Sequence, residues 1–170
     1  MNTLRLIPLL VVLHAPLAFA HGEEKHSTPG RDAASAQVTV APEATDAVAA
    51  LERFSTALSA GNLEAAGTEL DAGVLILESG GAERSREEYL GGHAKSDASF
   101  LKAAHVTLMR RTATASGDLA WIGSESEIHA TKDGKPLAIA STETAVLQKT
   151  TTGWKIVHLH WSSRRLGDAH

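Results

Sequence analysis

The sequence predicts an α+β domain in which helices pack on one face of a curved sheet. Two observations carry this prediction. Apolar residues recur at helical spacing in the first half of the chain, ahead of about position 102. From position 106 onward, apolar and polar residues alternate in four segments that short turn sequences separate. Helices followed by hairpin-connected strands are typical of the α+β class.

The first elements are expected to be two helices and a strand. Apolar positions within 48–58 follow helical spacing, and Gly61 ends that run. Asn62 is a residue type that caps helix starts, so a second, short helix is predicted at 63–70. The apolar run VLIL at 74–77 has the length and boundaries of a strand.

A third helical stretch is expected from Arg86 to about Lys102. Ser85 and Glu88 have the S-x-x-E spacing of a capping box, in which each residue satisfies free backbone N–H groups at the helix start. Gly91-Gly92 lies inside this stretch and is a potential break.

The second half of the chain is expected to form an antiparallel meander. Period-two patterns mark four strands, at 106–115, 119–130, 137–149 and 154–162. The first connection is Ser-Gly-Asp, the second contains Asp-Gly, which favours a tight hairpin, and the third is Thr-rich and ends in glycine. A short extended piece is also predicted at 37–40.

The N-terminus has the three parts of a secretory signal in the usual order. Arg5 supplies a positive charge, 6–13 (LIPLLVVL) is apolar but too short to span a bilayer, and Ala18-Phe19-Ala20 offers small residues at a cleavage site. The predicted division of the chain is a signal peptide at 1–20, a flexible arm at 21–44, a folded domain at 45–166 and a tail at 167–170. The expected location is therefore periplasmic or secreted.

The composition excludes several classes of function. The chain has 170 residues, a formal net charge of −4 and no cysteine. The charge gives no reason to expect nucleic acid as a partner, and after cleavage no membrane association is expected. The lack of cysteine excludes disulfides, thiol chemistry and zinc–thiolate sites.

The first candidate site lies on the third helical stretch. Tyr89, His93 and Asp97 are spaced i, i+4, i+8, so they share one face if the helix is continuous. A carboxylate one turn from an imidazole can orient the ring and raise its basicity, as a general base requires. The same residues could instead be metal ligands, or an ordinary solvated pair beside a glycine break.

The second candidate site is the last strand. Strand alternation places His158, His160 and Ser162 on one face and Trp161 on the other. Two histidines at i, i+2 can hold one metal ion when a third ligand joins them, and His93, His105 and His129 are available. Cleavage after Ala20 would make His21 the first residue, whose amino group and imidazole could together bind copper. The histidines could also line a ligand pocket or face solvent.

Acidic residues form the third candidate group. Glu78 ends the first predicted strand, Glu125 and Glu127 lie on the second strand of the meander, and Glu143 lies in the middle of the third. A charged side chain at mid-strand faces solvent, an interface or a pocket. If Glu143 faces a pocket, His93 or His160 is its expected partner.

The order of elements and several motifs resemble the NTF2-like superfamily, specifically the small bacterial SnoaL-like or DUF4440-type domains. The residues that carry the resemblance lie at 77–81, 85–89, His93, Asp97, Phe100, 117–121, Glu143-Thr144 and 153–164. The closing pattern G-W-x-I-x-x-x-H-W-S-S is the most specific of them. The resemblance covers about 46–164.

The resemblance implies a cone, in which a strongly curved antiparallel sheet wraps with its helices around a pocket. It implies that the pocket is lined by Glu78, Glu143, His160, Trp161 and Trp121, beside Tyr89, His93 and Asp97. Members often dimerise through the outer sheet face, so a homodimer is expected. No cofactor is expected.

Three functions follow from these observations. The first is non-catalytic binding of a small molecule, or an assembly role. The second is acid/base isomerisation or dehydration, with His93 as base, Asp97 orienting it, and Tyr89 or His160 donating to an oxyanion. The third is periplasmic copper or zinc binding through His158, His160 and His21. Fold alone does not choose among them.

Overall fold

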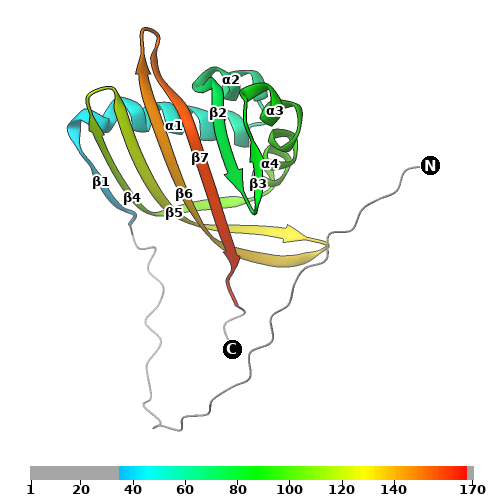
Figure 1. The fold of residues 1–170 in the computed structure, drawn as a ribbon. Helices are drawn as coiled ribbons and strands as arrows, with labels where there is room; N and C mark the ends of the chain where they lie inside the picture. The colour runs from blue at the N-terminus through cyan, green and yellow to red at the C-terminus, as the bar shows by residue number, and fades with distance from the viewer. Residues whose placement is uncertain (1–34, 168–170) are drawn as a thin grey trace, which may run out of the picture. The chain divides into compact units, whose positions relative to one another are not determined.

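The computed structural model describes residues 35–167. The predicted signal peptide, most of the predicted arm and residues 168–170 lie outside this range. The elements are, in order, β1 (Gln37–Val40), the 3-10 helix η1 (Pro42–Ala44), α1 (Thr45–Ser59), α2 (Leu63–Glu69), β2 (Leu70–Glu78), β3 (Gly81–Glu83), α3 (Arg86–Gly91), α4 (His93–Lys102), β4 (His105–Ser116), β5 (Leu119–Lys132), β6 (Lys135–Thr150) and β7 (Gly153–Arg165). Figure 1 shows the helices gathered against one side of a curved sheet, so the predicted α+β class is confirmed.

The sheet has seven strands in the order β1-β4-β5-β6-β7-β2-β3. The predicted meander of β4 to β7 is antiparallel throughout. Two pairs are parallel, however: β2 with β7, and β1 with β4. The sheet is therefore mixed rather than wholly antiparallel. Strand β1 precedes the helices and β2 lies between α2 and α3, so neither is joined to its parallel partner by a hairpin.

The folded part of the chain begins earlier than the predicted boundary at position 45. Val38 and Val40 lie in β1, which pairs in parallel with residues 110–113 of β4. Ala41 N–H then donates to the Ala113 carbonyl at 3.0 Å. The extended piece at 37–40 is thus an edge strand of the sheet, although its own side chains are largely exposed.

Helix α1 supplies the main apolar cover of the sheet. Its buried side chains include Leu51, Phe54 and Leu58, which recur at the spacing that puts them on one face. The helix ends where predicted, with Gly61 at φ +77°, a conformation that glycine adopts without strain. Asn62 then caps α2 by accepting from Ala65 N–H at 3.0 Å.

The third helical stretch breaks at the two glycines. The Ser85 hydroxyl accepts from Glu88 N–H at 3.1 Å, which confirms the predicted cap, and the Glu88 carboxylate accepts from Arg84 N–H at 2.7 Å, one residue before the position of a capping box. Helix α3 ends at Gly91, and Gly92 (φ −119°, ψ −104°) redirects the chain before α4 starts at His93. The residues on either side of this break therefore do not share one continuous helical face.

One row of the sheet forms the centre of the core. Residues paired across five neighbouring strands are Ala113, Ile122, Ala145, Leu159 and Ile76. Each is at most 2% exposed. This row fixes which side chains of each strand point inward, because strand side chains alternate between the two faces.

Strand β7 has a bulge that changes which of its side chains point inward. Ile156 pairs with Leu147 and His158 with Val146, so Val157 is an extra residue in the ladder. Before the bulge Trp154 and Ile156 are buried, and after it Leu159 is buried and Trp161 points inward. A bulge of this kind redirects the side chains that follow it.

None of the helices in the described range is long and apolar enough to cross a membrane.

Candidate functional site

A pocket of about 410 Å³ lies between the inner face of the sheet and helices α1 and α4. Phe54 and Leu58 of α1 and Phe100 and Leu101 of α4 form its helical wall. More of the lining surface is apolar than polar, although four charged and seven hydroxyl side chains contribute to it. Such a composition is typical of small-molecule sites.

The sheet wall of the pocket is ordered in rows that run across the strands. Next to the core row lies a charged row, in which directly paired residues of five strands are Glu78, Trp161, Glu143, Ser124 and Arg111. Next comes a serine row, Leu108, Ser126, Ser141 and Ser163. The outermost lining row is apolar, Val106, Ile128 and Ile139. All members of these three rows line the pocket.

Asp97 enters the pocket from α4 and is held by Tyr89. The Tyr89 hydroxyl donates to Asp97 Oδ2 at 2.9 Å, and the Tyr89 side chain is fully buried. Burial raises the pKa of Asp97, while the hydrogen bond from Tyr89 and the nearby His93 partly oppose the rise. The pKa of Tyr89 is raised as well, first by burial and then by the charge of Asp97. Tyr89 therefore acts as a hydrogen-bond donor here, not as a base.

Glu78 supplies a second carboxyl group to the pocket, in addition to that of Asp97. Burial raises its pKa, and the charge of Asp97 raises it further. Two neighbouring carboxyls that repel each other hold a proton to higher pH than either would alone. Glu78 and Asp97 together therefore offer a proton donor within a largely apolar pocket.

Glu143 faces the pocket from the other side of Trp161. Trp161 Nε1 donates to Glu143 Oε2 at 2.9 Å. The indole stacks on Phe54, with ring centroids 6.4 Å apart and planes 14° apart, and makes a tilted contact with Tyr89 at 6.2 Å. These contacts fix the Trp161 ring and, through it, one oxygen of Glu143.

Arg111 is the last residue of the charged row, and its guanidinium group already has partners within the protein. Its Nε donates to Ser124 Oγ at 3.2 Å, and its Nη1 makes a 2.7 Å ion pair with Glu52 of α1. The pocket thus contains three carboxyls and one paired guanidinium.

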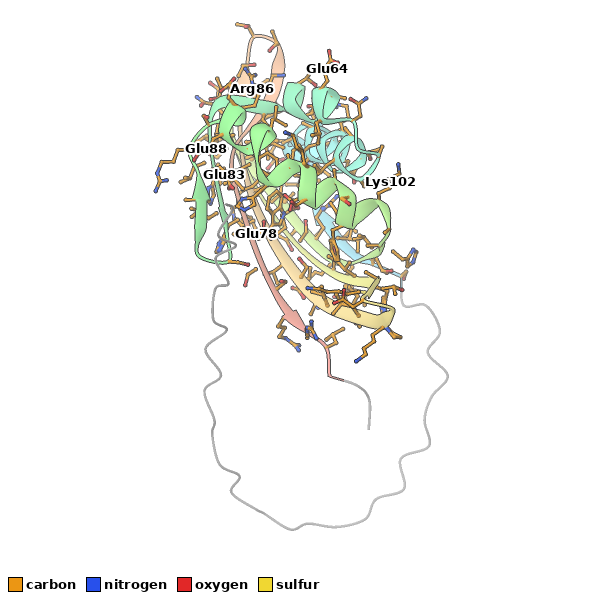
Figure 2. All side chains as sticks on the ribbon, turned by 90° about the vertical axis from the view of Figure 1, so that its right-hand side faces the viewer. Glu64, Glu78, Glu83, Arg86, Glu88 and Lys102 are labelled. Atoms are coloured by element: carbon orange, nitrogen blue, oxygen red, sulfur yellow. The ribbon has the colours of Figure 1, made fainter. Side chains whose placement is uncertain are left out.

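His93 lies outside the pocket lining and pairs with Glu83 instead of Asp97. Its Nδ1 contacts Glu83 Oε1, and the His93 side chain is 62% exposed whereas that of Glu83 is 8% exposed. Figure 2 shows Glu78 and Glu83 near the end of α4 that lies away from Lys102. The Glu83 hydrogen bond is the main cause that raises the pKa of His93. His93 and Asp97 share helix α4, so the break at Gly92 does not separate them; His93, the first residue of α4, contacts Glu83 of β3, whereas Asp97 accepts its hydrogen bond from Tyr89.

Three further residues expected in the site lie on the outer face of the sheet. Trp121 and His158 belong to one outer row, and His160 belongs to the next. His160 is exposed because Trp161 takes the inward direction, and His158 Nδ1 donates to the Leu75 carbonyl at 2.9 Å. Trp121 is 43% exposed, and its ring lies so close over Gly123 that a Cβ there would be 3.1 Å from it. None of the three lines the pocket.

Among residues 35–167, no group of three or more His, Asp or Glu side chains is placed to hold a metal ion. The proposed terminal ligand His21 lies outside this range, so the metal hypothesis stays a prediction.

Several lining residues were not anticipated from the sequence. Arg111 and the serines at 124, 126, 141 and 163 face the pocket, whereas the acidic candidates Glu125 and Glu127 alternate to the outer face. The i, i+2 repeat of Ser124 and Ser126 shows in the sequence that these two serines share one face of β5. It does not show whether that face points into the pocket or to solvent.

Comparison with known proteins agrees with this geometry. The family described as "SnoaL-like domain" matches residues 47–164, most of the chain. The chain belongs to the SnoaL-like domain family. No significant match was found among curated proteins.

Solved structures similar to this SnoaL-like chain include a candidate ketosteroid isomerase from Shewanella frigidimarina. It is 33% identical, with a TM-score of 0.67, over 75% of this chain and all of that one. A candidate dehydratase of the NTF2-like family from Streptomyces avermitilis is 20% identical, with a TM-score of 0.61, over 71% and 95% of the two chains. The CaMKII hub of S. rosetta is 21% identical, with a TM-score of 0.60, over 73% and 98%. The NTF2-like fold is therefore confirmed.

Proposed function

We propose that this SnoaL-like domain binds an uncharged, apolar small molecule in its pocket and moves a proton on it by acid/base chemistry. The observation that supports the proposal is the carboxyl pair Glu78 and Asp97, whose pKa values are both raised inside one pocket. A carboxyl that keeps its proton to higher pH can donate a hydrogen bond to a carbonyl oxygen. Perturbed acids in a concave, mostly apolar site are characteristic of catalytic centres.

The positions of the three carboxyls suit a proton shift next to a carbonyl. The protonated member of the Glu78–Asp97 pair would donate to the carbonyl oxygen of the ligand. Glu143, two strands away from Glu78, would take a proton from the adjacent carbon and return it to another carbon of the same skeleton. Charge developing on the oxygen is stabilised by the donor, and the base ends each cycle as it began.

The likeness to the Shewanella protein, named as a candidate ketosteroid isomerase, supports this class of reaction. His93 has no direct role in the proposed step, because it lies outside the pocket lining. Non-catalytic binding in the same pocket is the alternative, and it differs only in the outcome of a turnover assay.

The test uses a β,γ-unsaturated ketosteroid and the purified protein. Its binding is measured by calorimetry, and its conversion to the conjugated ketone by ultraviolet absorbance. Conversion that falls at least about 100-fold in Asp97→Asn and Glu143→Gln, with Glu64→Gln unchanged, supports acid/base catalysis. Glu64 is an exposed carboxyl on α2 and serves as the matched control. Binding without conversion supports the non-catalytic alternative.

We also propose that the domain forms a homodimer through the outer face of its sheet. Trp121 and Leu75, two of the large exposed apolar side chains, lie in one outer row together with Val146 and His158. Exposed apolar surface of this kind marks interfaces. Sedimentation should show a dimer that Trp121→Ser weakens, whereas Val106→Ser, an equally exposed residue of the pocket rim, leaves it intact.

Export to the periplasm or the cell exterior is proposed from residues 1–20 alone. The mass of the protein recovered from its native host checks this proposal, since cleavage after Ala20 leaves a chain that starts at His21. An intact Met1 or a cytoplasmic fraction would contradict it.

A further inference from the structure

We propose that Ser126, Ser141 and Ser163 form a second polar subsite of the pocket, which binds a hydroxyl or carbonyl oxygen on the body of the ligand. This inference rests on the function proposed above and names the substrate class more closely. The ligand would be a rigid apolar skeleton with two oxygens, one at the carboxyl pair and one at the serines.

The three serines are direct neighbours in space. Ser126 of β5 pairs with Ser141 of β6, and Ser141 pairs with Ser163 of β7. Neighbouring strands lie about 4.8 Å apart, so the three hydroxyls form a line roughly 10 Å long along the pocket wall. A single serine in this position would be unremarkable, but three in register make a continuous polar strip.

The hydroxyls of this strip are free to bind a ligand. Within residues 35–167, none of the three makes a side-chain hydrogen bond to the protein, whereas Ser124 in the adjacent row is engaged by Arg111. A ligand that covers the strip displaces water from these hydroxyls. If it offers no oxygen in return, the hydroxyls lose their partners and binding is weakened. The strip therefore favours ligands that place an oxygen against the serine hydroxyls over ligands that are apolar at that position.

The rows define the spacing of the two oxygens. The serine row lies two residues beyond the charged row along β5, β6 and β7, which is about 6.7 Å, and Glu78 lies one strand beyond β7, about 4.8 Å to the side. Beyond the serines, Ile128 and Ile139 offer an apolar wall for the far end of the skeleton. An anionic group is disfavoured, because the pocket holds three carboxyls and Arg111 is already paired with Glu52.

The experiment compares two uncharged ketones that differ by one hydroxyl, 2-acetylnaphthalene and 6-hydroxy-2-acetylnaphthalene. Binding of each to the purified protein is measured by calorimetry. We expect the hydroxylated ketone to bind about five- to tenfold more tightly, the effect of one hydrogen bond. Ser141→Ala should reduce this advantage to less than about twofold, while the affinity for the plain ketone stays within about twofold.

The matched control is Ser162→Ala, since Ser162 is the neighbour of Ser163 on β7 and faces away from the pocket. It should leave both affinities unchanged. Equal binding of the two ketones, or a hydroxyl preference that survives Ser141→Ala and Ser126→Ala, would overturn the serine subsite but not the proposed function. Failure of both ketones to bind would overturn the proposed binding function, and the subsite with it.

Discussion

The hydroxyl of Tyr89 donates a 2.9 Å hydrogen bond to Asp97 across the break between α3 and α4. The two residues come from different helices, and the donor is fully buried. The bond therefore connects the core to the pocket and determines where the Asp97 carboxyl points.

Replacing Tyr89 by Phe removes that bond and keeps the ring. The pKa of Asp97 should rise further, because the hydrogen bond from Tyr89 lowers it in the native protein. The free energy of unfolding should fall by about 1.5–3 kcal/mol, the value of a hydrogen bond to a charged group. Carbon-13 NMR titration and urea denaturation measure the two effects, and an unchanged Asp97 titration would contradict the assignment.

Asp97→Asn should lower the pKa of Glu78. Burial is the main reason that this pKa is raised, and the charge of Asp97 is the second. Removing the charge should therefore bring the Glu78 pKa part of the way, but not fully, to its ordinary range. NMR titration of Glu78 tests this, with Glu64→Gln as the control that leaves the Glu78 curve in place.

The interaction of His93 with Glu83 should be visible in the titration of the imidazole. Glu83→Gln is expected to return the His93 pKa toward its ordinary value of 6.5, because the Glu83 hydrogen bond is the largest cause of the increase. Proton NMR of the His93 ring reports the change. An unchanged His93 titration would show that the contact does not persist in solution.

Stability should decrease as pH rises, in two stages. Glu78 and Asp97 have pKa values above their ordinary 4.5 and 3.8 in the folded state, so the folded protein binds more protons than the unfolded chain above those values. The stability that this proton binding contributes is present at lower pH and is lost as pH rises through the folded pKa values. His93 has the same sign, and its contribution is present below 6.5 and lost as pH rises through its folded pKa.

Urea denaturation at a series of pH values separates the two stages. The Glu78→Gln/Asp97→Asn double variant should lack the acidic stage, and His93→Gln should lack the stage nearer neutrality. A variant that retains the stage assigned to it would show that another group is responsible.

Local features of this fold could be predicted well from the sequence. The Ser85–Glu88 cap, the glycine break, the Asn62 cap and the antiparallel meander all depend on residues close together in the chain. Local preference decides such features without knowledge of the remaining fold. Glu78, Asp97 and Glu143 line the pocket in the structure, whereas their roles stay predictions.

Features that depend on distant pairing could not be predicted in the same way. The parallel pairing of β1 with β4 joins residues some seventy positions apart, and no local pattern marks it. The alternation in β5 shows that Trp121 and Ser124 face opposite sides, but does not show which side is inward. The Glu83 partner of His93 similarly depends on where β3 lies relative to the start of α4.

The bulge at Val157 means that the chemical character of the pocket depends on a residue count. Trp154 and Trp161 are an odd number of residues apart, so a β7 of the same length without the bulge would turn His158 and His160 inward in place of Leu159 and Trp161. Related sequences that are one residue shorter in this segment would instead keep Leu159 and Trp161 inward on a regular strand without a bulge. In comparing relatives, the length of this segment should be aligned before the identity of any residue in it is interpreted.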